Sequence, residues 1–246
     1  MRAPLVGLGL GLTALLLSPT LTLAETAAAE PVAAIEAAAA AATAVEPSAA
    51  VARTEQIAAT AQTPHEMVDL STKALLEFVD EARPWAKDEP ERYYREVEAL
   101  LSPVVDFKNF ARGVMATNYK KASTEQRERF RESFKWGLVK TYSLALTEFN
   151  DGKVEVLEPD REPDNPKRQR VKMEITAPSG DVFPVVYAVR QSKSKRWRIY
   201  NLVVNGVNMG LTFRSQFASA MKDRRYGGDL DQVIDAWASV VADADS

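Results

Sequence analysis

Apolar residues recur at helical spacing in the first half of the region that begins at residue 64. In its first stretch Leu70, Ala74 and Phe78 fall four positions apart, a spacing typical of an amphipathic helix. Farther along, Ser123 and Gln126 form the capping-box pattern that opens a helix. With the proline breaks between them, these patterns predict four helices, at residues 65–87, 93–101, 107–117 and 123–149.

The second half of the chain is rich in β-branched and aromatic residues, interrupted by short turns. Turn sequences such as Pro178 to Gly180 and Ser192 to Lys195 favour an antiparallel meander. The fold class is therefore α+β: N-terminal helices, a four-stranded antiparallel sheet and C-terminal helices. We expect strands at 153–159, 168–177, 182–191 and 196–204, and closing helices at 209–224 and 229–242.

One strand is apolar at consecutive positions. Residues 182–189 read VFPVVYAV, so apolar material should cover both faces of this strand. Two interpretations stay open: two layers of helices, or helices on one side and a lipid cavity on the other. The second half of the long helix is also apolar on most sides, so we expect protein to enclose it.

The N-terminus has the composition of a secretory signal peptide. After Arg2 the chain is uncharged from Ala3 to Ala24, and cleavage is expected after Ala24. The alternative is an uncleaved anchor, because a stretch of this length could span a bilayer. Almost half of residues 25–63 are alanine, which predicts a disordered linker, and the folded domain is expected over residues 64–246.

The sequence offers few groups for catalysis. It contains no cysteine, and His65 is its only histidine, so Ser-His-Asp, Cys-His and His-ligated zinc sites lack members. Ser192 and Lys195 match S-x-x-K, but no S-D-N or K-T-G partner accompanies them. A carboxylate pair for acid–base chemistry stays open, because acidic residues are numerous.

Basic residues are concentrated between positions 167 and 198, in a domain whose positive and negative residues balance overall. Nucleic acid is not expected as a partner, because the chain is expected to be exported. Two interpretations stay open: a solvated hairpin, or a docking face for acidic lipid headgroups or a membrane-complex subunit. The docking candidates are Lys193, Lys195 and Arg196.

Two long blocks carry a resemblance to a known family. One is RWRIYNLVVNGVNMGLTFRSQF at 196–217, and the other is FARGVMATNYKKASTEQRERFRESFKWGLVKTYSLAL at 110–146. In their order and spacing they resemble the MlaC or toluene-tolerance family, the periplasmic phospholipid-binding components of the Mla system. The chain departs from the family's usual Asp, Glu and Ser at Asn201, Asn205 and Asn208.

The resemblance implies a sheet lobe like nuclear transport factor 2, joined to helices around an apolar lipid cavity. It also implies a monomeric, cofactor-free periplasmic carrier without covalent chemistry. Such a carrier shuttles a glycerophospholipid between an inner-membrane ABC-type Mla complex and an outer-membrane Mla lipoprotein complex. The alternatives are an exported enzyme with a similar sheet lobe and a small polar active site, and a ligand-free periplasmic adaptor. The candidate lipid-binding residues are Phe134, Leu138, Tyr142, Leu146, Val171, Met173, Ile175, Phe183, Val185, Tyr187, Ile199 and Leu202.

Overall fold

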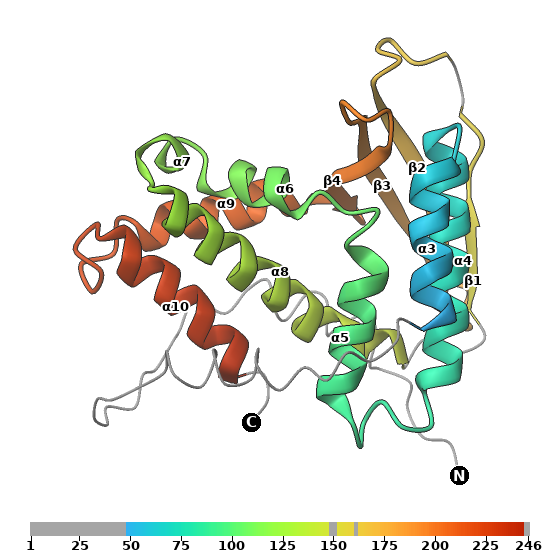
Figure 1. The fold of residues 1–246 in the computed structure, drawn as a ribbon, viewed down its shortest axis with the longest axis horizontal. Helices are drawn as coiled ribbons and strands as arrows, with labels where there is room; N and C mark the ends of the chain where they lie inside the picture. The colour runs from blue at the N-terminus through green and yellow to red at the C-terminus, as the bar shows by residue number, and fades with distance from the viewer. Residues whose placement is uncertain (1–47, 148–151, 160–161, 244–246) are drawn as a thin grey trace. The chain divides into compact units, whose positions relative to one another are not determined.

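A computed structural model describes residues 48–147, 152–159 and 162–243 (Figure 1). Its elements run as helices, then a sheet, then helices, which confirms the α+β class. The expected signal peptide and the first part of the alanine-rich segment fall in residues 1–47, outside the described residues. None of the helices in the described ranges is long and apolar enough to cross a membrane.

The alanine-rich segment is not a linker throughout, because α3 occupies Ala49–Thr60. Ser48 caps this helix by accepting a hydrogen bond from the amide of Val51 at 3.4 Å. Val51 is buried, and Ile57 and Ala58, which lie about two helical turns farther along, are buried as well. They form a narrow apolar stripe that the surrounding alanines conceal in the sequence. The expected disordered linker up to residue 63 is therefore wrong for this stretch, and the folded unit begins before residue 64.

All six of the expected helices form, and the cap predicted at Ser123 is present. The capping box closes in both directions: the Gln126 amide donates to Ser123 Oγ at 3.0 Å, and the Ser123 amide donates to Gln126 Oε1 at 2.9 Å. The first expected helix ends five residues early, because Pro84 has no amide hydrogen for the next helical bond. The short α7 (Asn118–Lys121) was not predicted. The six are α4 (Pro64–Ala82), α5 (Pro90–Leu101), α6 (Phe107–Met115), α8 (Thr124–Thr147), α9 (Met209–Ala220) and α10 (Leu230–Asp243).

The sheet is an antiparallel meander of five strands in the order β1-β2-β3-β4-β5. Four were expected, and the fifth is a two-residue strand. Asn205 and Gly206 adopt positive φ angles of 48° and 81°, which closes a tight turn and brings Val207 opposite Val204. The strands are β1 (Lys153–Val156), β2 (Arg168–Thr176), β3 (Val182–Gln191), β4 (Trp197–Val204) and β5 (Val207–Asn208).

The register of the central strands gives the sheet one apolar face. Val171 is paired with Tyr187, Met173 with Val185, and Ile175 with Phe183. On the other side of β3, Tyr187 is paired with Leu202, and a bulge after Ala188 brings Ile199 opposite Val189. All eight of the expected lipid-binding sheet residues therefore lie on one face. In Figure 1 α3 and α4 lie across the strands, and α4 contacts β1, β2 and β4.

The opposite face of the sheet is not covered as expected. At the start of β3, Val182 is 49% exposed and Pro184 is also exposed. The neighbouring strand β2 contributes the exposed Arg170 and Lys172 to this face, so apolar and charged side chains alternate across the strands. The prediction that apolar material covers both faces of this strand is wrong here. The neighbouring strand places charged side chains on the same face, and the sequence of one strand alone does not reveal them.

Most of the buried apolar residues among the described ones form three separate clusters. The aromatic core joins α6, α8, α9 and α10, the α5 core joins α3, α4, α5 and α8, and the sheet core lies between α3, α4 and the sheet. Their central members are Phe110, Phe130, Phe134 and Phe213 for the aromatic core, Phe78, Tyr93 and Leu100 for the α5 core, and Met67, Val171, Val189 and Ile199 for the sheet core.

Because Ile57 of α3 is part of the sheet core, Ile57→Ala should destabilise the protein by about 2 to 4 kcal/mol, measured by urea unfolding. The matched control is Glu55→Ala, an exposed position on the same helix, where the expected change is within about 0.5 kcal/mol. Equal unfolding free energies for the two variants would show that α3 does not support the sheet.

Candidate functional site

The apolar face of the sheet is the first part of the candidate site. Val171, Met173, Val185 and Ile199 are buried on it. The other four expected residues are only half-buried, and they are Ile175, Phe183, Tyr187 and Leu202. Burial is thus complete on part of the face and incomplete along the rest.

The long helix α8 supplies the second part of the site. Phe134 is buried in the aromatic core, with its ring centroid 5.1 Å from that of Phe110 and 5.4 Å from that of Phe213. Leu138 and Tyr142 are half-buried and pack against the same core. The expected enclosure of the second half of α8 is therefore incomplete.

The structure brings most of the expected residues together. Leu202 of β4 packs against the aromatic core, as do Leu138 and Tyr142 of α8, so the sheet face and the helix border the same core. Val204 packs against this core as well and is paired with Val185 of β3. Leu146 does not join them, because it packs against the α5 core instead.

Met173 and Val185 are buried but belong to none of the three clusters among the described residues. Along the strands they lie between the sheet core on one side and the half-buried Ile175 and Phe183 on the other. We call these strand positions, taken together with three half-buried residues that pack against the aromatic core, the apolar seam. It consists of Met173, Ile175, Phe183, Val185, Leu202, Leu138 and Tyr142.

The surroundings of the seam disfavour charge. Burial raises the pKa of Tyr187 to about 12, and its hydroxyl donates to the weakly accepting Sδ of Met173, at 3.9 Å. Burial also raises the pKa of Tyr142. Both phenols therefore stay neutral at physiological pH. A site of this kind can hold hydrocarbon, and it is poorly suited to acid–base chemistry.

The residues of the seam lie within a region that matches a known family. The family model described as MlaC protein matches residues 70–239. The toluene tolerance protein ttg2D of Pseudomonas putida is 39% identical over 189 residues, covering 76% of this chain and 86% of that protein. The chain belongs to the MlaC family.

Two further comparisons agree with membership of the MlaC family. The intermembrane phospholipid transport system binding protein MlaC of Haemophilus influenzae is 26% identical over 155 residues, covering 61% of this chain and 72% of that protein. A solved phospholipid-binding protein from Ralstonia solanacearum, in complex with a phospholipid, superposes with a TM-score of 0.65 at 20% identity. That match covers 73% of this chain and 97% of the other, and it shows a shared fold.

The three departures from the usual MlaC residues build the junction between β4, β5 and α9. Asn208 caps α9 by accepting a hydrogen bond from the amide of Leu211 at 3.1 Å. Asn201 donates to Asn208 Oδ1 at 3.0 Å and accepts from the amide of Gly210 at 2.9 Å. A Cβ at position 210 would lie 2.5 Å from Asn201 Oδ1, so the close contact requires glycine. Asn205 supplies the positive φ of the turn.

The basic hairpin lies at the turn between β3 and β4. Lys193, Lys195 and Arg196 are exposed there, and Lys195 has a φ of 61°. The turn is closed by Ser192, whose amide donates to the carbonyl of Arg196 at 2.8 Å. The next residue, Trp197, is buried and donates its indole hydrogen to the carbonyl of Gln62 at 3.2 Å. The hairpin is thus anchored at its base and solvated at its tip.

Sequence reasoning missed Asp106, which links α6 to the sheet. Its carboxylate accepts a hydrogen bond from the backbone amide of Asn109 at 3.0 Å. It also accepts two from the guanidinium of Arg190, at 3.1 and 2.5 Å. Burial acts to raise the pKa of Asp106, but the hydrogen bonds from Asn109 and Arg190 outweigh it and hold the pKa below its usual value. An Asp directly before a helix is a signal for a helix cap, and Asp106 holds this position. Its pairing with Arg190 could not be predicted locally, because Arg190 lies far away in the sequence.

Removing the Asp106 charge should destabilise the protein in a pH-dependent way. Since the folded pKa is lowered, the stabilisation is present above the unfolded value near 4 and is lost as the pH falls through the folded pKa. Asp106→Asn should therefore lower the free energy of unfolding at pH 7 by about 1 to 3 kcal/mol, and the gap to wild type should shrink in acid.

Urea unfolding at pH 7 and in acid measures this difference. The control is Asp69→Asn, which breaks an exposed ion pair with Lys73 and should be nearly neutral at pH 7. A gap between wild type and Asp106→Asn of the same size at both pH values would show that the ionised carboxylate is not its source.

Proposed function

We propose that this protein is a phospholipid carrier that holds acyl chains along the apolar seam and performs no covalent chemistry. The observation that carries the proposal is that eight apolar sheet residues share one face, and that Leu202 of this face packs against the same aromatic core as Leu138 and Tyr142 of α8. The names of its relatives support it, because one is an intermembrane phospholipid transport binding protein and another was solved with a phospholipid.

The energetics of hydrocarbon explain why such a face is needed. Burying one CH₂ group is worth about 0.8 kcal/mol, so exposing a chain of ~16 carbons costs on the order of 12 kcal/mol. A carrier must therefore enclose the chains. We propose that the half-buried Ile175, Phe183 and Leu202 contact the chains directly, and that the buried Met173 and Val185 form the wall behind them.

Phe134, Val171 and Ile199 have a different role in this proposal. Each is buried within a core cluster, Phe134 in the aromatic core and the other two in the sheet core. They hold the walls of the site in place. Leu146 supports α8 from the α5 core and is assigned no contact with lipid.

We also propose that the chain is exported to the periplasm and cleaved after Ala24. The uncharged segment from Ala3 to Ala24 supports this step. Its proposed partners are an inner-membrane ABC-type Mla complex and an outer-membrane Mla lipoprotein complex, between which a glycerophospholipid is shuttled by a monomer. The measured intact mass of the mature protein should equal that of a chain whose first residue is Glu25.

Mass spectrometry of organic extracts tests the carrier function. The protein purified from cells should yield about one phospholipid per chain. Val185→Asp and Leu138→Asp should abolish this recovery, because a charge beside acyl chains is poorly solvated. The control is Val182→Asp, on the same strand as Val185 but exposed on the opposite face, which should keep its lipid.

A bulky apolar substitution separates loss of lipid from loss of folding. Leu138→Trp adds volume without charge at a half-buried position, so it should reduce lipid recovery while circular dichroism stays native. Wild-type protein without phospholipid would contradict the carrier proposal. Normal lipid recovery in a folded Val185→Asp variant would remove Val185 from the site.

We further propose that the basic hairpin speeds docking to the inner-membrane complex. A clustered positive surface accelerates encounter with an anionic partner more than it tightens the final complex. Replacing Lys193, Lys195 and Arg196 together by Glu should slow lipid transfer to that complex and leave bound lipid and thermal stability unchanged. Raising the salt concentration should slow the wild type toward the variant, because exposed charges are screened within about 8 Å.

The matched control reverses three exposed basic residues elsewhere, Arg95, Lys222 and Arg224, and produces the same change in net charge. Its transfer rate should stay close to that of wild type. Equal lipid-transfer rates for the hairpin variant and the wild type at low salt would show that the hairpin is a solvated turn with no role in docking.

A further inference from the structure

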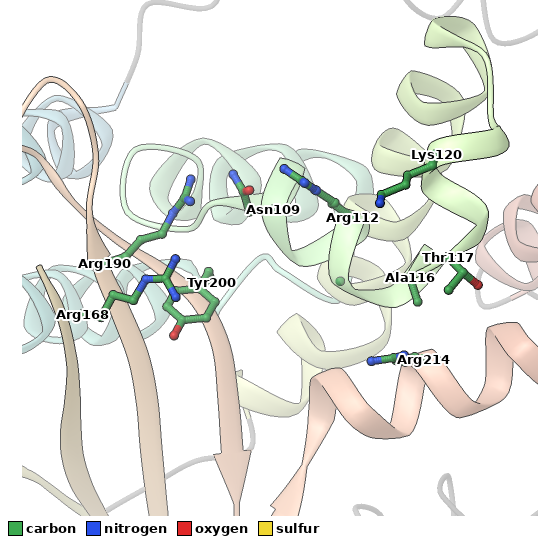
Figure 2. Close-up of a pocket in the computed structure, with 10 residues that line it drawn as sticks. Asn109, Arg112, Ala116, Thr117, Lys120, Arg168, Arg190, Tyr200 and Arg214 are labelled. Atoms are coloured by element: carbon green, nitrogen blue, oxygen red, sulfur yellow. The ribbon is translucent and has the colours of Figure 1, made fainter. Parts of the chain in front are cut away.

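A pocket of about 590 Å³ lies on the face of the sheet opposite the apolar seam. Five cationic side chains from five elements line it (Figure 2). Its volume is in the range typical of sites for small ligands. The cations are Arg112 of α6, Lys120 of α7, Arg168 of β2, Arg190 of β3 and Arg214 of α9.

The positive charge of this basic pocket is largely uncompensated. Arg190 is paired with Asp106. The other four cations form no ion pair with a carboxylate in the part of the chain that the structure describes, and Arg112 instead lies over the ring of Tyr119 at 5.4 Å. Like charges gathered in a concave site repel one another, so the arrangement favours an anionic occupant.

The basic pocket is separate from the seam at the strands. Arg168 and Arg190 are paired across β2 and β3 and project from the face opposite Val171 and Val189. Those two valines are fully buried in the sheet core beneath α3 and α4. The protein behind this wall of the pocket is therefore filled, and an occupant of the pocket does not reach the acyl chains through the sheet.

The groups in the pocket fit a phosphate best. Figure 2 shows Arg168 and Arg190 near Tyr200 on the strand side, with Arg112 and Lys120 on the helical side. Arginine presents paired N–H donors that match phosphate oxygens, and several cations suit a dianion better than a single carboxylate. Thr117 and Tyr200 add neutral hydrogen-bond donors around the same space.

We propose that the basic pocket binds a phosphate group, either on a small soluble molecule or on a lipid headgroup, independently of the lipid held in the seam. The site requires at least Arg168 from the strand side and Arg214 from α9. Both are exposed, so replacing them should not disturb the fold.

Calorimetric titration of the mature full-length protein with glycerol 3-phosphate tests the proposal. Saturable binding is expected, and Arg168→Gln and Arg214→Gln should each weaken it about tenfold, the effect of losing one charged hydrogen bond. The control is Arg95→Gln, an exposed arginine of α5 outside the pocket, which should bind as wild type does. Phospholipid recovered from the seam should be unchanged in all three variants.

Sedimentation with phosphatidylglycerol vesicles separates the two sources of phosphate. Loss of vesicle binding in both pocket variants, with competition by glycerol 3-phosphate, assigns the pocket to a membrane headgroup. Unchanged vesicle binding with weakened glycerol 3-phosphate binding assigns it to a soluble phosphate compound. Three results would overturn the proposal: no saturable binding of either probe, wild-type affinities in both pocket variants, or binding of a polyglutamate peptide but not of glycerol 3-phosphate. Loss of the seam lipid in a folded pocket variant would overturn the independence of the two sites.

Discussion

The pairing register of β2, β3 and β4 determines what each face of the sheet can do. Because side chains alternate along a strand, a shift of β2 by one residue would move Val171 and Met173 to the solvent face and bring Arg170 and Lys172 into the core. The proposed hydrocarbon seam and the proposed anion pocket are thus two consequences of one register. The buried Val171 and Val189 resist such a shift, since both are fully enclosed in the sheet core.

The helices extend this constraint beyond the sheet. α3 and α4 close one part of the apolar face, and there burial is complete. The aromatic core holds α8 at the other side through Phe134, and there Leu138, Tyr142 and Leu202 are left half-buried. Close packing leaves no room for a ligand, and full exposure would give no affinity for hydrocarbon. The half-buried positions of the seam meet the condition that the proposed carrier of acyl chains needs.

Local sequence patterns predicted the helices and strands well, but they could not predict contacts between residues that are distant in the sequence. The helix caps at Ser123, the turn at Asn205-Gly206 and the strand positions depend on neighbours in sequence, and they formed as expected. The docking of α3 depends on a few apolar residues among many alanines, which periodicity did not separate from a linker. The candidate residues of the sheet were correctly placed on one face, because the alternation of side chains along a strand is a local property. The sequence could not distinguish residues that would touch a lipid from residues buried behind them. Leu146 has the helical spacing of its neighbours and yet packs in another core.

The amide residues at the junction of β4 and α9 show how a hydrogen bond can persist while its charges change. Where the family usually has Asp and Ser, a Ser hydroxyl at 208 could donate to an Asp at 201. Here Asn201 donates its amide hydrogen to Asn208 Oδ1 and keeps its own oxygen for Gly210. Asn208 also caps α9. Neutral amides thus build the whole junction, so its hydrogen bonds hold the first turn of α9 on β4 without an ionised side chain at position 201 or 208.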